Sequence, residues 1–172
     1  MASLKSGPIR ETPEYQKAQT DERFQSWLRM QDAAIELEFI IFDVPELRGH
    51  LYTRDGIVIA EQAALERFPG HREAFTGDNL KLAMRFVYFI GETFRRHTEG
   101  TWVAVPQASP KTGALQAIDA PYSTGFYAPI DMLQMALAQR TGDKILKIFD
   151  YAVEDHQKWI AAGKPSRGKQ QQ

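Results

Sequence analysis

The chain has 172 residues, of which 43% are hydrophobic and 11% aromatic, so it is long enough to bury the core of one folded domain. Its 21 Lys and Arg balance 22 Asp and Glu to a net charge of -1, and no overall field favours nucleic acid or an anionic membrane. The absence of cysteine excludes disulfides, thiol nucleophiles and zinc sites that use sulfur, and it fits a reducing cytoplasm.

The two ends of the chain are polar. Residues 1–12 contain no apolar run, and residues 163–172 are rich in Gly, Lys and Gln, so we expect both segments to be disordered. The N-terminal segment has the pattern of neither a signal peptide nor a membrane anchor, which predicts a cytoplasmic protein. Residues 13–162 show no repeat and no long linker, and we expect them to form a single globular domain.

A long helix is predicted from Pro13 to about Phe42. Thr12 is a suitable cap for its first turn, and apolar residues recur behind it at helical spacing. The dense apolar stretch from Ile35 to Val44 also fits a strand after a break near Gln31, because Ile and Phe favour strands. We favour the helix.

The next predicted helix runs from Ile57 to Phe68, with Thr53 as its cap. A hairpin at Asp55-Gly56 followed by a strand from Ile57 is the alternative, because this segment is β-branched.

The clearest element is a core helix from Asn79 to Arg96, whose apolar residues spread around more than one face. Thr76 or Asp78 is expected to cap it, and Gly100 is expected to end it in a left-handed conformation. Gly91 lies inside this helix, where glycine usually signals the close approach of a neighbouring element.

The second half of the chain predicts a hairpin followed by two helices. The strands are Trp102 to Val105 and Ala114 to Ile118, and the helices are Pro129 to Arg140 and Asp143 to Ala162, the latter capped by Asp143. The predicted fold is therefore a helix-rich α+β domain, with a small antiparallel sheet near residues 102–118 packed on a central buried helix.

Metal and nucleophile signatures are weak throughout. The best metal-binding set is Asp150, Glu154 and His156, but Glu154 and His156 are two residues apart on a helix and point away from each other. Ser123 lacks the sequence context of a hydrolase nucleophile, and no glycine-rich phosphate loop is present. We therefore predict no catalytic residue, no metal and no cofactor.

Two features remain as candidate functional positions. Glu92 is a carboxylate on a mostly apolar helix, where it is either paired with a nearby arginine or is a functional acid with a perturbed pKa. The loop from Pro121 to Tyr127 supplies the candidate partner-binding residues, because aromatic side chains give large contact areas at low entropic cost. These residues are Tyr122, Ser123, Phe126 and Tyr127; the alternative is that Phe126 and Tyr127 pack under the final helices.

Two segments carry a resemblance to a known group. Tyr52-Thr-Arg-Asp-Gly-Ile57 running to Leu65-Glu-Arg-Phe68, and Phe89-Ile-Gly-Glu-Thr-Phe-Arg-Arg96 followed by Gly100-Thr-Trp-Val103, resemble small uncharacterised bacterial α+β proteins that include toxin-immunity-type proteins. The match covers roughly a third of the chain. The resemblance implies a non-catalytic inhibitor that binds a bacterial toxin domain.

The leading functional prediction is accordingly a protein-interaction module of immunity type, with neither nucleic acid nor membrane as a partner. One alternative is an enzyme or small-molecule-binding domain, with a pocket beside the central helix that uses Glu92, His97 and Tyr127. Another is a structural homo-oligomer in which Ile35 to Val44 pairs with a second copy. The protein is expected to be a monomer or a homodimer.

Overall fold

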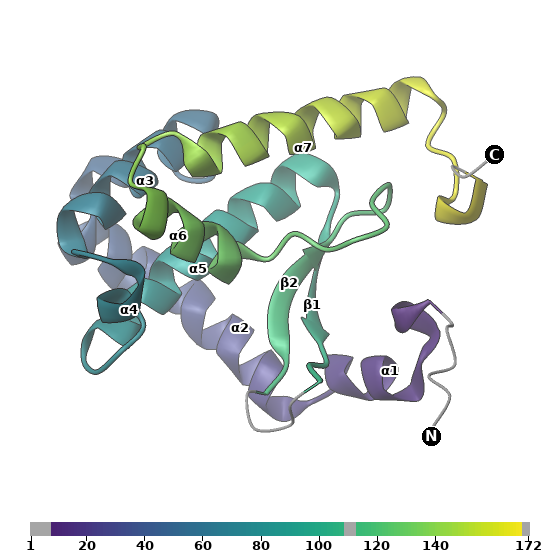
Figure 1. The fold of residues 1–172 in the computed structure, drawn as a ribbon, viewed down its shortest axis with the longest axis horizontal. Coiled ribbons are helices and arrows are strands. Elements are labelled where there is room, and N and C mark those ends of the chain that lie inside the picture. The colour runs from purple at the N-terminus through teal and green to yellow at the C-terminus, as the bar shows by residue number, and fades with distance from the viewer. Residues whose placement is uncertain (1–7, 109–112, 170–172) are drawn as a thin grey trace.

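Helices dominate the part of the chain that the computed structural model describes, residues 8–108 and 113–169 (Figure 1). A two-stranded antiparallel sheet completes the structure, so the predicted helix-rich α+β class is confirmed. The α-helices are α1 (Pro13–Gln19), α2 (Glu22–Ala34), α3 (Arg54–Arg67), α4 (His71–Ala74), α5 (Asn79–Thr98), α6 (Pro129–Gln139) and α7 (Lys144–Ala161). A π-helix, η2 (Ile35–Asp43), continues α2, and short 3-10 helices lie at Ile9–Glu11, Pro45–Leu47 and Arg167–Lys169.

Helix α5 lies at the centre of the domain, as its sequence predicts. It contacts α2, η2, α3, α4, α6, α7 and both strands, and most of its residues from Ala83 to Phe94 are buried. In Figure 1, α6 and α7 lie on one side of α5, and α2 passes on the other. A helix that other elements cover on several sides needs apolar residues on more than one face, which explains its sequence.

Asp78 holds the N-cap position of α5, which is one of the two positions predicted, but the capping bond and the C-terminal stop differ from the prediction. Asp78 makes no side-chain capping hydrogen bond, and the left-handed residue at the C-terminal end is Glu99 (φ 53°) instead of Gly100. Gly100 has a different requirement, because a Cβ atom there would lie 2.5 Å from Cγ2 of Ile118 on the neighbouring strand. The glycine is needed for space against the sheet.

The long helix predicted from Pro13 is interrupted. Asp21 accepts a hydrogen bond from the backbone N–H of Arg23 (2.8 Å) and starts α2 after a turn at Thr20. The chain then continues as π-helix through Ile35–Asp43, so the alternative strand at this position is wrong as well. The break allows α1 to leave the direction of α2 and to contact β1.

The sheet consists of β1 (Thr101–Val105) and β2 (Leu115–Asp119), with Trp102 opposite Ile118, which confirms the predicted hairpin. The side-chain amide of Gln19, at the end of α1, forms the two hydrogen bonds with β1 that the backbone of another strand would form. Its Nε2 donates to the carbonyl of Ala104 (2.7 Å), and its Oε1 accepts from the N–H of Ala104 (2.9 Å). On the other strand, the backbone of Tyr127 exchanges two hydrogen bonds with Ile118.

Helix α3 begins where its sequence predicts. The side chain of Thr53 accepts from the backbone N–H of Gly56 (3.0 Å), so the helix is confirmed and the hairpin alternative is wrong. Asp143 precedes the first residue of α7 as predicted, but its side chain makes no capping hydrogen bond. Instead the buried carboxyl group of Glu61 on α3 accepts from the backbone N–H groups of Lys144 (3.0 Å) and Ile145 (2.6 Å).

Both ends of the described chain meet at Asp119. Arg10 donates to its carboxylate through Nε and Nη2 (3.0–3.2 Å), and Arg167 donates through Nη2 (2.7 Å). Residues 8–12 and 163–169 thus have defined contacts although their composition favours disorder. The disorder that we expect for the remaining terminal residues, 1–7 and 170–172, falls outside the described part of the chain.

The Asp119→Asn substitution is expected to loosen both ends together, because an amide accepts more weakly than a carboxylate from two guanidinium groups. Limited proteolysis should show faster cleavage after Arg10 and after Arg167 than in the unchanged protein. Asp155→Asn, at an exposed position on α7, is the matched control and should leave both rates unchanged. Faster cleavage at one end alone would contradict the shared role of Asp119.

Candidate functional site

Glu92 lies in the centre of a closed hydrogen-bond network. Its carboxylate accepts from Nε and Nη2 of Arg95 (2.9 and 2.6 Å), from Nε of Arg96 (3.0 Å) and from the indole Nε1 of Trp102 (2.9 Å). Trp102 in turn stacks on Tyr88, with ring centroids 5.4 Å apart and planes 6° apart. The network joins α5 to β1.

The pKa of Glu92 lies below its ordinary value. Burial raises this pKa, but the hydrogen bonds from Arg95, Trp102 and Arg96 lower it by more. The group is therefore an ionised, fully paired carboxylate at neutral pH, and it has no proton to donate as a general acid. This is the paired alternative that the sequence leaves open for Glu92.

His97 and Tyr127, the residues proposed together with Glu92 for a small-molecule pocket, do not line a common pocket with Glu92. His97 Nε2 is 2.8 Å from the carbonyl oxygen of Tyr52, and Tyr127 shares a hydrogen bond with the hydroxyl of Tyr122. The hollow beside Glu92, about 410 Å³ in volume, is lined by neither His97 nor Tyr127.

Acid should reveal the stabilising role of Glu92. Because the pKa of the folded state is depressed, the stabilisation is fully present above about pH 4.5 and is lost as the pH falls. Urea unfolding at pH 7 and pH 3.5 should therefore show a smaller loss of stability for Glu92→Gln than for the unchanged protein. Glu66→Gln, exposed on α3, should keep the normal acid dependence. An equal loss of stability between pH 7 and pH 3.5 in all three proteins would contradict the stabilising role of Glu92.

The predicted partner-binding loop is largely engaged within the molecule. The hydroxyl of Tyr122, which is buried, donates to the carbonyl of Ala152 on α7 (2.9 Å), and the ring of Tyr127 packs 5.5 Å from that of Phe94. Phe126 lies under the guanidinium group of Arg10, at 4.1 Å from the ring centroid. The backbone carbonyl of Ser123 accepts from Arg167 (2.7 Å). Tyr122 is therefore buried by these contacts, whereas Phe126 and Tyr127 are half-buried.

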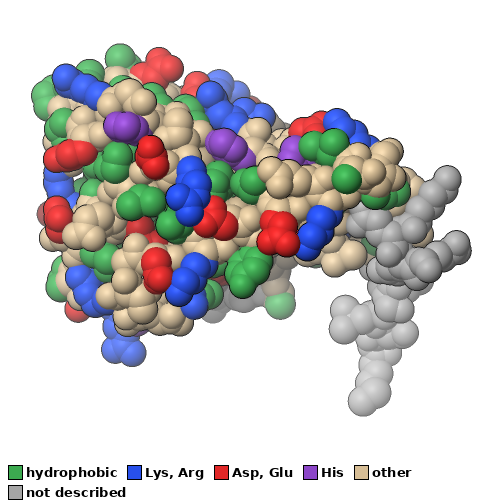
Figure 2. Space-filling model, turned by 90° about the horizontal axis from the view of Figure 1, so that it is seen from above, with side chains coloured by type: hydrophobic (Ala, Val, Ile, Leu, Met, Phe, Trp, Pro, Cys, Tyr) green, Lys and Arg blue, Asp and Glu red, His purple; other side chains and the backbone are tan. Residues whose placement is uncertain are grey.

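The three residues on α7 that the sequence offers as a metal-binding set each pair with a different residue. Asp150 pairs with Arg54 (2.8 Å), Glu154 with Lys158 (2.8 Å) and His156 with Glu99 (2.8 Å). On the face shown in Figure 2, acidic and basic side chains are interspersed along the molecule. Within residues 8–108 and 113–169, no three His, Cys, Asp or Glu side chains are grouped to hold a metal ion.

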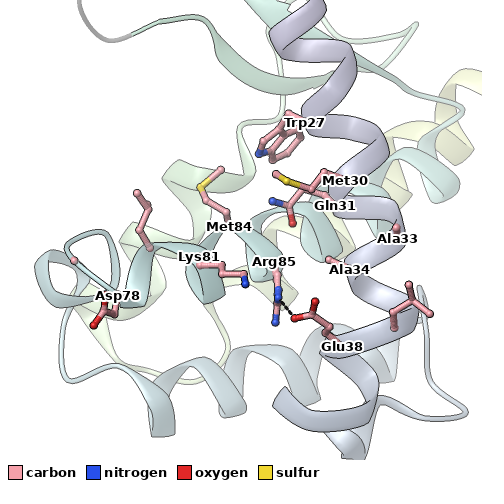
Figure 3. Close-up of a pocket in the computed structure, with 13 residues that line it drawn as sticks. Trp27, Met30, Gln31, Ala33, Ala34, Glu38, Asp78, Lys81, Met84 and Arg85 are labelled. Carbon is pink, nitrogen blue, oxygen red and sulfur yellow. Dashed lines mark hydrogen bonds and ion pairs between the residues drawn. The ribbon is translucent and has the colours of Figure 1, made fainter.

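An open groove separates α2 and η2 from the beginning of α5 (Figure 3). Its volume is about 770 Å³, within the usual range for ligand pockets. We call it the docking groove. Its apolar lining comes from Trp27, Met30, Ala33, Ala34, Leu37, Leu80 and Met84.

Large apolar side chains stay exposed along the docking groove. Met30 is 60% exposed and Leu37 is 66% exposed on the α2 and η2 side, and Leu80 is 43% exposed on the α5 side. Phe42, one turn further along η2 and outside the lining of the groove, is 73% exposed. Clustered exposure of this kind is typical of interaction sites, whereas single exposed apolar residues are ordinary.

The end of the docking groove near Arg85 and Glu38 is charged. Arg85 is buried and donates to Asp43 (2.6 Å) and to Glu38, as Figure 3 shows for the second pair. Lys81 and Asp78 also line this end. The carboxylates that line the groove, Glu38 and Asp78, are matched in number by two cations, Lys81 and Arg85. An apolar channel with a charged end suits an amphipathic segment of a protein.

Comparison with family models, with curated proteins and with solved structures finds no match to this chain. None of the described helices is both long enough and apolar enough to cross a membrane. The geometry of the docking groove is therefore the strongest functional observation.

Proposed function

We propose that this protein is a non-catalytic interaction module that binds a partner protein through the docking groove. The observation that carries the proposal is the line of exposed Met30, Leu37 and Leu80 beside an open apolar groove. Water contact at such side chains is unfavourable by about 25 cal/mol per Å² of apolar surface, so covering them favours association. The two methionines of the groove add side chains that adapt to the shape of a partner.

The partner class that we propose is a bacterial toxin domain, which would make the protein an immunity-type inhibitor in the cytoplasm. Support for this class comes from the two segments, residues 52–68 and 89–103, that resemble proteins of a group with immunity-type members. We place the contact surface at the docking groove instead of the loop at Tyr122 to Tyr127, because the rings of that loop already pack against α5, α7 and Arg10.

We expect a gene that neighbours the gene of this protein to encode a toxin domain, and the test is binding to its product. We expect a stable complex and rescue of growth on co-expression. Leu37→Glu should weaken the complex by at least about 100-fold, because it places a charge in a desolvated apolar contact. Val58→Glu is the matched control, since Val58 is also exposed (40%) but lies on α3, away from the groove. It should bind like the unchanged protein.

Three outcomes would count against the proposal. The toxin could fail to bind, or Leu37→Glu and Val58→Glu could bind equally well, which would remove the groove from the interface. Light scattering of the isolated protein could also show a tight dimer that Leu37→Glu dissociates. In that case η2 pairs with a second copy, and the structural homo-oligomer replaces the inhibitor.

A further inference from the structure

One buried polar atom in the docking groove has no partner among the described residues. It is the side-chain oxygen Oε1 of Gln31, a residue that lines the groove and is only 5% exposed. A buried acceptor without a donor is unfavourable, and buried polar groups in folded proteins are almost always paired. Among the described residues, none donates a hydrogen bond to this acceptor in the groove.

The surroundings of Gln31 select the kind of group that could supply this donor. In Figure 3 the amide lies beside Met30, below Trp27, on the side of α2 that faces Met84 of α5. Thioether and aromatic side chains make favourable contacts with aromatic rings. The terminal torsion of glutamine is soft, so the amide can turn toward a ring that enters between the two methionines.

We propose that this end of the docking groove receives an indole side chain from the partner protein, with its N–H donating to Oε1 of Gln31. An indole brings one donor and no acceptor, so a single acceptor satisfies it. Tryptophan is also among the residues that most often dominate interface energetics.

The charged end of the groove fits the same partner segment. Trp27 and Glu38 are eleven residues apart, which corresponds to roughly 15 Å of helix and to two or three turns of a bound helix. At that end the half-exposed carboxylate of Glu38, beside Arg85, offers an acceptor to a basic side chain of the partner. The occupant is thus an amphipathic helix with a tryptophan at one end and a lysine or arginine at the other. This assignment rests on the proposed function, in which a protein occupies the groove.

Indole and 1-methylindole are the probes that test the anchor, because methylation removes the donor and leaves the ring. The full chain with ¹³C-labelled methionine methyl groups is titrated with each probe. We expect saturable shifts of the Met30 and Met84 signals, and binding of 1-methylindole about five-fold weaker than binding of indole. Gln31→Met, which keeps the length of the side chain without the acceptor, should bind both probes equally. Gln62→Met, exposed on α3, should keep the preference for indole.

Equal affinity of the two probes for the unchanged protein would overturn the proposal, and so would a preference for indole that persists in Gln31→Met. The first comparison needs no variant, so it decides even if Gln31→Met fails to fold. The result is separable from that of the toxin experiment. If the unchanged protein shows no preference for indole but Leu37→Glu still disrupts the toxin complex, only the tryptophan anchor is contradicted. If the unchanged protein prefers indole but Leu37→Glu leaves toxin binding unaffected, only the proposed interface with the toxin is contradicted.

Discussion

Replacing Gly91 by alanine is expected to destabilise the fold by about 3 kcal/mol, the upper part of the range for overpacked cores. A Cβ atom at this position would lie 2.1 Å from Cη2 of Trp102 and 2.8 Å from Cγ of Pro129. Trp102 has little freedom to retreat, because its Nε1 is bonded to Glu92 and its ring stacks on Tyr88. The higher helix propensity of alanine offsets about 1 kcal/mol of the strain, which this figure includes. Urea unfolding followed by tryptophan fluorescence measures the change.

Gly125→Ala is the matched control, because a Cβ atom there meets no other atom within 4 Å and its φ angle is not in the left-handed region. We expect a change within about 0.5 kcal/mol, or a slight gain from the lower entropy of the unfolded chain. If the two substitutions had equal effects, close packing at Gly91 would not be the reason for the glycine.

Replacing Glu61 by alanine should cost about 3 kcal/mol as well. The substitution leaves the N–H groups of Lys144 and Ile145 without their acceptor at the start of α7, and it opens a cavity where the carboxyl group lies at 1% exposure. Gln in place of Glu61 keeps one acceptor oxygen but turns an NH₂ group toward an N–H donor, so we expect an intermediate loss. Calorimetric unfolding gives both values.

Hydrogen exchange provides a second measurement, because the loss at Glu61→Ala should be concentrated in the first turn of α7. Glu66→Ala removes an exposed carboxylate from the same helix and should change stability by less than about 0.5 kcal/mol. Normal protection of the amides at Lys144 and Ile145 in Glu61→Ala would contradict the capping role.

The sequence predicts best where local pattern and burial coincide. Helix α5 carries apolar residues on more than one face, and this pattern has few solutions other than a core helix. Gly91 interrupts that pattern, and the close approach that it predicts is confirmed by the contact with Trp102. The break before α2 was also open to prediction, because Asp21 is a favourable cap residue inside the segment taken as one helix.

Other features depend on contacts between distant segments. The cap of α7 comes from Glu61, 83 residues before Lys144, and nothing near Asp143 in the sequence indicates it. The docking groove is hidden for a related reason. Met30 and Leu37 repeat at helical spacing like core residues, and the sequence does not show which apolar face the fold leaves uncovered. Gln31 gives no sequence signal, since an isolated glutamine on a helix is usually solvated.

The contact between Gln19 and Ala104 also restricts how this protein associates with others. A two-stranded sheet ordinarily offers free backbone groups at its edges, where a foreign strand can add and where aggregation begins. Here Gln19 engages both backbone groups of Ala104 on one edge, and Tyr127 engages those of Ile118 on the other. Extension of the sheet by a third strand is therefore opposed at both edges, and the proposed binding through the helices does not compete with it.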